Sequence, residues 1–129
     1  MATPRMRSPL SRAIGLGSAK AGAEHWWAQR VTALALVPLA LWFVIAVIEL
    51  AGADRALVVD WLRHPAPAVL LVLLLIATFY HGALGLQVVI EDYVENEALR
   101  VGLLIVIRLA AIVLAVLGVF AVLKLSLGA

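Results

Sequence analysis

The sequence predicts an all-α integral membrane protein, a bundle of three transmembrane helices with the N-terminus in the cytoplasm. Two observations of composition predict this class. Apolar residues make up 65% of the 129 residues and charged residues only 14%, and the mean hydropathy is +1.09. A soluble domain of this length could not bury so much apolar surface. The third observation is that the apolar residues fall into three long stretches, which a bilayer can cover.

The three expected spans run over about residues 31–50, 66–90 and 101–123. A helix of roughly 20 apolar residues is long enough to cross the hydrocarbon. Pro38 lies inside the first span and is expected to kink it, which membrane helices tolerate. Pro65 and Pro67 fit the first turn of the second span, where a missing N–H costs little.

The distribution of basic residues predicts the orientation and the organisation of the chain. Residues 1–30 form a basic N-terminal tail, and residues 31–129 form a single transmembrane domain. Six of the ten Lys and Arg residues lie in the tail and at the end of the 91–100 loop, against three on the opposite side. This asymmetry places the tail in the cytoplasm, or in a mitochondrial matrix. The Arg- and Ser-containing tail also resembles a transit peptide weakly, so a tail and a transit peptide both remain open.

Composition excludes several function classes. Without cysteines, the chain cannot carry a disulfide framework or a Cys-ligated zinc or iron–sulfur site. The basic tail has no nucleic-acid-binding motif, so no nucleic acid partner is expected. Three spans leave no room for a large soluble domain. Any soluble chemistry must therefore come from a partner.

His81 is the most informative polar residue, because ionisable groups inside a span are expensive and are functional candidates by default. It precedes Tyr93 by twelve residues, about 18 Å along a helix, which puts it near mid-depth. Gly82 and Gly85 leave a smooth surface beside it, and the expected helical face carries Leu74, Thr78, Gly85, Val88 and Asp92. A neutral imidazole there is either an axial ligand to haem iron or a packing residue bonded to a neighbouring helix.

Two further groups of polar residues lie near the expected ends of the spans. Glu91, Asp92 and Tyr93 follow the second span. They are either ordinary interfacial residues or part of a quinone pocket, where a phenol donates a hydrogen bond and a carboxylate orients it or relays protons. Residues 25–30 open the first span as His-Trp-Trp-Ala-Gln-Arg. They are an aromatic and cationic anchor, or Arg30 pairs with an anionic group such as a haem propionate.

Arg108 lies within the third span. It is expected to snorkel toward the cytoplasmic interface, or to pair with Glu91, Asp92 or a haem propionate. Glu49 lies at the outer end of the first span and His64 in the outer loop, and neither needs a special role.

Two of these segments resemble the small hydrophobic membrane-anchor subunit of succinate dehydrogenase, the D subunit of respiratory complex II. One is residues 25–33, His-Trp-Trp-Ala-Gln-Arg-Val-Thr-Ala, running into a Leu-rich span. The other is His81 with Gly82 and Gly85, then Gln-Val-Val at 87–89 and Asp-Tyr-Val at 92–94. The resemblance covers roughly residues 20–125, and it includes the three spans with the N-terminus inside. Glu91 beside Asp92 and Arg108 in the third span depart from the family pattern.

The resemblance implies specific roles. His81 would be an axial ligand to iron in haem b, shared with the larger cytochrome b anchor subunit that supplies the second histidine. Tyr93 and Asp92 would contribute to a ubiquinone site. Arg30 would lie near the haem propionates or the quinone pocket. The chain would carry no catalytic residue for succinate oxidation, and would hold the flavoprotein and iron–sulfur subunits at a bacterial inner membrane, which is favoured over a mitochondrial one.

Two alternatives stay open at this point. A quinol:fumarate reductase anchor would have the same residues, because the direction of electron flow depends on potentials that this chain does not reveal. A small non-redox membrane scaffold subunit would use His81 for packing alone. It would bind no haem, and a change at Tyr93 would leave quinone reduction unaffected.

Overall fold

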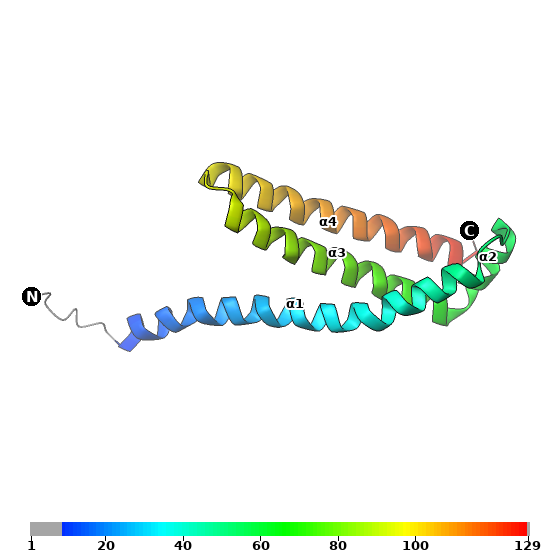
Figure 1. The fold of residues 1–129 in the computed structure, drawn as a ribbon, viewed down its shortest axis with the longest axis horizontal. Helices are drawn as coiled ribbons and strands as arrows, with labels where there is room; N and C mark the ends of the chain where they lie inside the picture. Colours follow the sequence, from blue (N-terminus) through cyan, green and yellow to red (C-terminus); the bar gives the residue numbers. More distant parts are fainter. Residues whose placement is uncertain (1–8, 129) are drawn as a thin grey trace, which may run out of the picture.

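The described residues form four helices and no strand in a computed structural model, which covers residues 9–128 and gives side chains from residue 22 onward. They are α1 (Pro9–Glu49), α2 (Arg55–Arg63), α3 (Pro65–Tyr93) and α4 (Glu97–Ser126). Figure 1 shows α3 and α4 running antiparallel, with α1 along the other side of α3. The side chains of Arg5, Arg7, Arg12 and Lys20 in the basic tail lie outside the described residues.

Three of the helices are long and apolar enough to cross a membrane, as the sequence predicted. The candidate spans are Gly22–Glu49, Pro65–Tyr93 and Glu97–Ser126. The first starts earlier than the expected position near residue 31, because the helix continues through the Ala- and Trp-containing segment before it. α1 stays helical through Pro38. Figure 1 shows the helix bending in its cyan portion, as a missing backbone hydrogen bond permits.

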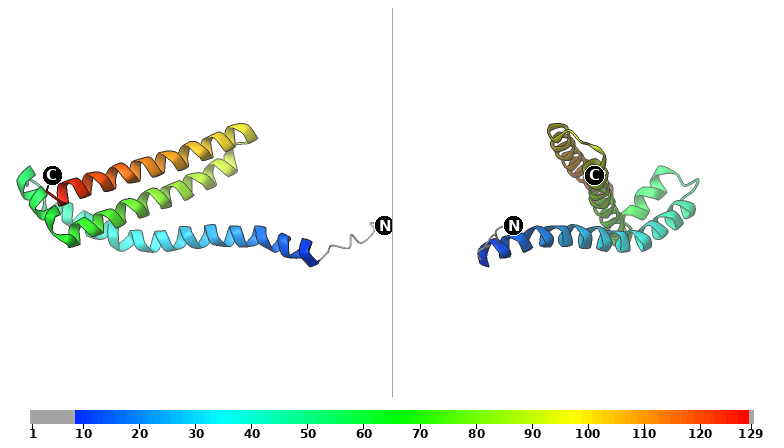
Figure 2. Two further views of the ribbon diagram at one scale, coloured as in Figure 1. Left: turned by 180° about the vertical axis from the view of Figure 1, so that it is seen from behind. Right: turned by 60° about the vertical axis from the view of Figure 1, so that its left-hand side comes forward.

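Helix α2 was not expected, because an amphipathic helix of nine residues is too short to give the signature of a span. The carboxylate of Asp54 caps it by accepting a hydrogen bond from the Leu57 N–H at 2.9 Å. The indole of Trp61 stacks on that of Trp42 near the end of α1, with ring centroids 6.0 Å apart. This contact holds α2 against the end of the bundle that lies opposite the α3–α4 loop (Figure 2).

The ends of α3 and α4 follow ordinary capping chemistry. Pro65 stands in the first turn of α3, as the sequence predicted. The side chain of Asn96 caps α4 by accepting a hydrogen bond from the Leu99 N–H at 3.0 Å. Glu97 in the first turn and Lys124 in the last turn of α4 complement the helix dipole.

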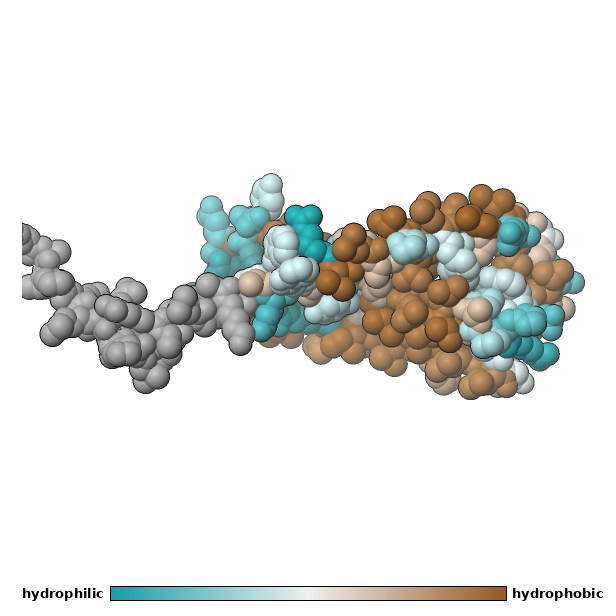
Figure 3. Space-filling model, turned by 90° about the horizontal axis from the view of Figure 1, so that it is seen from below, coloured by the Kyte–Doolittle hydropathy of each residue, from teal (hydrophilic) through white to brown (hydrophobic). Residues whose placement is uncertain are grey.

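The bundle has almost no interior of its own. The buried apolar residues among those described are Ala46, Leu62, Ala68, Leu84 and Ile90. In the most apolar stretch of each candidate span, at most 6% of the residues are buried. The face in Figure 3 has a broad apolar middle, with hydrophilic residues gathered toward its two ends. Such a surface needs lipid or partner subunits to cover it.

Helices α3 and α4 pack closely at Gly118. A Cβ atom at this position would lie 3.1 Å and 3.2 Å from the two terminal carbons of Leu75. By contrast, a Cβ at Gly102 on the same helix would meet nothing within 4 Å. Gly118 is therefore a point of close helix approach, of the kind that small residues permit in membranes.

We expect Gly118→Leu to lower the stability of the α3–α4 pair by about 1–3 kcal/mol, the usual cost of overpacking. The measurement is the apparent melting temperature of the detergent-solubilised protein. Gly102→Leu is the matched control and should leave the melting temperature close to that of the wild type. Equal melting temperatures for the two variants would contradict the close packing at Gly118.

Candidate functional site

His81 lies on α3 where it faces α1, and it bonds to Thr32 across the two helices. The distance from His81 Nδ1 to Thr32 Oγ1 is 3.0 Å. Thr32 Oγ1 is also 2.7 Å from the carbonyl oxygen of Ala28 and 3.1 Å from that of Gln29. Thr32 lies in the 25–33 segment that carries the family resemblance, but the sequence predicted no role for it. The periodicity of one helix cannot show which residue of another helix a side chain meets.

The contacts of Thr32 favour one tautomer of His81. A threonine hydroxyl has one hydrogen, and the 2.7 Å contact directs it to the carbonyl of Ala28, one turn earlier on the same helix. The hydroxyl oxygen then accepts a hydrogen bond from Nδ1–H of His81. In this tautomer Nε2 carries the free lone pair, and no described residue bonds to it. This is the arrangement in which histidine binds a metal.

Arg30 lies beside His81 at a small cavity between α1 and α3. The cavity has a volume of about 210 Å³ and is lined by Gln29, Arg30, Ala33 and His81. The guanidinium of Arg30 also stacks over the indole of Trp26, 5.4 Å from the ring centroid. This cation–π contact holds the guanidinium on the Trp26 ring. Arg30 and His81 are thus brought together although 51 positions separate them.

The helix surface next to His81 is open. A Cβ placed at Gly82 or at Gly85 would meet nothing within 4 Å. The glycines are therefore not required by packing inside this chain. They leave room for a partner helix or a flat group to approach the backbone of α3.

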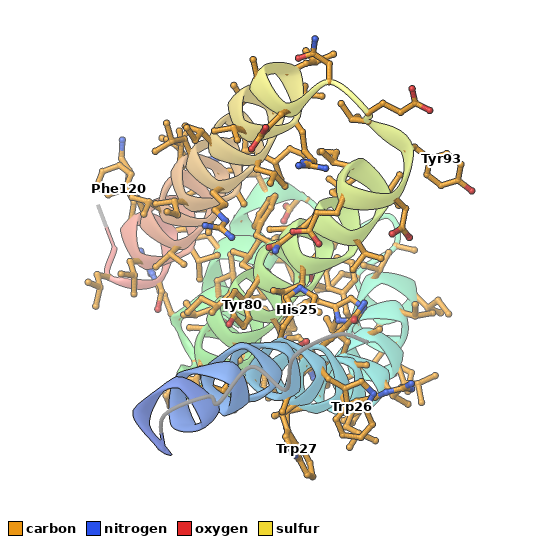
Figure 4. All side chains as sticks on the ribbon, turned by 90° about the vertical axis from the view of Figure 1, so that its left-hand side faces the viewer. His25, Trp26, Trp27, Tyr80, Tyr93 and Phe120 are labelled. Atoms are coloured by element: carbon orange, nitrogen blue, oxygen red, sulfur yellow. The ribbon has the colours of Figure 1, made fainter. Side chains whose placement is uncertain are left out.

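Tyr93 and Asp92 lie at the C-terminal end of α3, the helix that also carries His81. Tyr93 is the last residue of α3 and is 82% exposed. Figure 4 shows its ring pointing away from all the helices. Neither the small cavity beside His81 nor the large cavity described next is lined by Tyr93 or Asp92. Any pocket around this pair needs residues that another subunit supplies.

A larger cavity of about 730 Å³ lies between α1, α3 and α4. His25 and Tyr80 point into it, whereas Trp26 and Trp27 point away from the helices (Figure 4). His25 Nε2 is buried and has no hydrogen-bond partner among the described residues. The 25–30 segment thus lines both cavities: His25 lines the large cavity and Arg30 lines the small one.

Arg108 lines this larger cavity and donates a hydrogen bond to Gln87. The sequence did not predict this partner. Arg108 Nη2 donates to Gln87 Oε1 at 3.2 Å, and Gln87 Nε2 donates to Glu91 Oε1 at 2.8 Å. The expected pairing of Arg108 with Glu91 is therefore indirect, through the amide. No direct ion pair forms among the described side chains.

These features define a class of protein. Three apolar spans with little buried surface, one oriented imidazole inside the membrane and an exposed phenol at a span end are the properties of a membrane subunit that works within a larger assembly.

The comparisons give the family. The chain belongs to the succinate dehydrogenase/fumarate reductase transmembrane subunit family, whose model matches residues 4–119. It is similar to the succinate dehydrogenase hydrophobic membrane anchor subunit of Rickettsia bellii, 36% identical over 116 residues that cover 90% of this chain and 93% of the relative. The Paracoccus denitrificans subunit of the same name is 30% identical over 125 residues, 97% of this chain and 96% of the relative. No solved structure matches the chain significantly.

The relatives' names support an anchor role for this chain in the membrane. They agree with the expectation from the sequence that the chain contributes helices and not a soluble catalytic domain.

Proposed function

We propose that this chain is the small membrane-anchor subunit of a succinate:ubiquinone oxidoreductase in a bacterial inner membrane. It would hold a flavoprotein and an iron–sulfur subunit at the cytoplasmic face, beside a larger cytochrome b anchor subunit. The Lys and Arg residues outside the spans lie mostly in the N-terminal tail and at the end of the α3–α4 loop, which supports a cytoplasmic N-terminus. The exposed apolar helices support a role that requires partners.

The observation that carries the redox part of the proposal is the hydrogen bond between Thr32 and His81. It fixes the imidazole and leaves Nε2 available to iron, and the bare backbone at Gly82 and Gly85 fits a flat macrocycle. The residues therefore fit haem b, with His81 as one axial ligand. When bound, haem supplies a one-electron redox centre whose potential depends on its ligands and surroundings.

The second axial histidine would come from the larger anchor subunit. In the membrane-spanning segments that the structure describes, His81 is the one histidine near mid-depth. The cavity beside it holds about 210 Å³, less than even small-ligand sites usually enclose. Completing the pocket thus requires a second protein surface. Arg30 at the rim of this cavity would pair with a haem propionate.

Tyr93 and Asp92 would contribute to the ubiquinone site. The phenol of Tyr93 is free to donate a hydrogen bond to a quinone carbonyl. Asp92, the next residue, would orient the phenol or relay protons when the quinone is reduced. Because Tyr93 is 82% exposed in this chain alone, the other walls of the site would come from the larger anchor and iron–sulfur subunits.

A fumarate reductase anchor is the second candidate, because the matching family model includes fumarate reductase subunits. The names of the relatives, all at 29–36% identity, favour succinate dehydrogenase. A quinone preference assay separates the two. A succinate dehydrogenase would reduce ubiquinone, and a fumarate reductase would oxidise a low-potential quinol.

We expect His81→Ala to abolish or alter a low-spin b-type haem signal, because the substitution removes one axial ligand. The measurement is a reduced-minus-oxidised absorption spectrum of the assembly purified through a tag on this chain. His64→Ala is the control, since His64 is exposed between α2 and α3, outside the spans. An unchanged haem spectrum in His81→Ala would exclude His81 as a ligand.

We expect Tyr93→Phe to lower succinate:ubiquinone reductase activity about tenfold, the effect of losing about 1.4 kcal/mol from one hydrogen bond in the transition state. Succinate-dependent reduction of a soluble dye should stay unchanged, because the dye takes electrons before the quinone site. Tyr80→Phe, on the same helix but inside the large cavity, is the control. Full quinone reduction by Tyr93→Phe would rule out this role.

A further inference from the structure

The 730 Å³ cavity, which we call the α1–α4 groove, lies away from the proposed haem and quinone residues. Its floor on α3 includes Ala83 and Gln87. These residues lie about 160° and 120° around the helix from His81, at roughly 100° per residue. Leu84, which also lines the groove, lies only about 60° from His81. The groove nevertheless shares no lining residue with the small cavity beside His81, so the two are separate openings.

The groove is open toward the membrane because its two walls do not meet. Among the described residues, no Cα atom of α1 lies within 8 Å of a Cα atom of α4, whereas both helices pack against α3. In the right-hand view of Figure 2, α1 meets the α3–α4 pair at one end of the pair and diverges from it toward the N-terminus. A molecule in the surrounding bilayer could thus enter from the side.

The lining of the groove is amphiphilic along its length. Glu24, His25, Gln87 and Arg108 lie toward the α3–α4 loop. Ile76, eleven residues before Gln87 and so about 16 Å along α3, marks the opposite end. Apolar residues, among them Ala111 and Ala115 of α4, line the space between them. A ligand with a polar head and a hydrocarbon tail matches this order.

The polar end carries opposite charges on its two walls. Glu24 of α1 and Arg108 of α4 both line it, and no ion pair joins them among the described side chains. His25 also lines the groove, and its Nε2 is buried without a hydrogen-bond partner among the described residues. A charge inside a span is costly unless it is compensated. A headgroup with one anionic and one cationic part would compensate both walls at once.

We propose that the α1–α4 groove binds one aminophospholipid with a phosphoethanolamine headgroup. The phosphate accepts hydrogen bonds from the guanidinium of Arg108 and from His25. The primary ammonium donates to the carboxylate of Glu24. One acyl chain follows the apolar part of the groove toward Ile76.

Charge argues against a quinone as the occupant. A quinone headgroup is neutral, so it would leave Glu24 and Arg108 both uncompensated.

The test is lipid binding to the delipidated assembly, purified through a tag on this chain and followed by native mass spectrometry. The probes are phosphatidylethanolamine, phosphatidylglycerol and phosphatidylcholine with the same acyl chains. For one site per copy of this chain, we expect phosphatidylethanolamine to bind about tenfold more tightly than the other two, the ratio that 1.4 kcal/mol gives. Equal binding of all three lipids, or displacement of phosphatidylethanolamine by ubiquinone, would overturn the proposal.

Two substitutions separate the charges. Arg108→Gln should weaken all three lipids at this site, because each has the phosphate. Glu24→Gln should remove only the preference for phosphatidylethanolamine and leave phosphatidylglycerol bound as well or better. Lys124→Gln, which removes a charge in the last turn of α4, is the control and should change nothing. The proposal fails if Arg108→Gln and Lys124→Gln bind lipid alike.

A third variant tests the tail of the groove with both charges in place. Ala115→Phe should block the acyl chain, whereas Ala110→Phe, on the same helix and outside the lining, should not. Retained binding in Ala115→Phe would contradict the placement of the chain. Because the readout is lipid and not haem or quinone, this proposal can fail or succeed independently of the function proposed above.

Discussion

The hydrogen bond between Thr32 and His81 ties α1 to α3 at the level of the intramembrane imidazole. Its contribution to stability is small, since such bonds average about 0.6 kcal/mol in membranes. Its effect on geometry is larger. It sets the ring orientation, it selects the tautomer, and it brings Arg30 of α1 to the same small cavity. The proposed haem ligation depends on all three.

The chain leaves most of its apolar surface exposed. Its three spanning helices bury almost nothing in one another. A subunit of this kind gains its stability from lipid and partner subunits. Both proposed sites follow from the same constraint. In the proposed haem site a second protein would cover the open side of His81, and in the proposed lipid site a lipid would fill the α1–α4 groove.

The sequence was enough to predict what depends on hydropathy and on position along one helix. The three spans, the helix start at Pro65 and the separation of His81 from Tyr93 all belong to this kind. Features that depend on how helices face one another could not be read from it. The Thr32–His81 bond and the contact of Arg108 with Gln87 join residues 49 and 21 positions apart. Helix α2 was missed for another reason, because an amphipathic helix of nine residues is too short to give a span signal.

The most direct measurement is the haem affinity of Thr32→Val, which keeps the shape of the side chain and removes its hydroxyl. Losing a partner that orients a ligating histidine typically costs 10–100-fold in affinity for the bound metal group. We therefore predict that Thr32→Val loses haem on dilution or competition at concentrations where the wild type retains it. Thr32→Ser keeps the hydroxyl and should behave as the wild type. Equal haem retention by Thr32→Val and the wild type would contradict the role of this hydrogen bond.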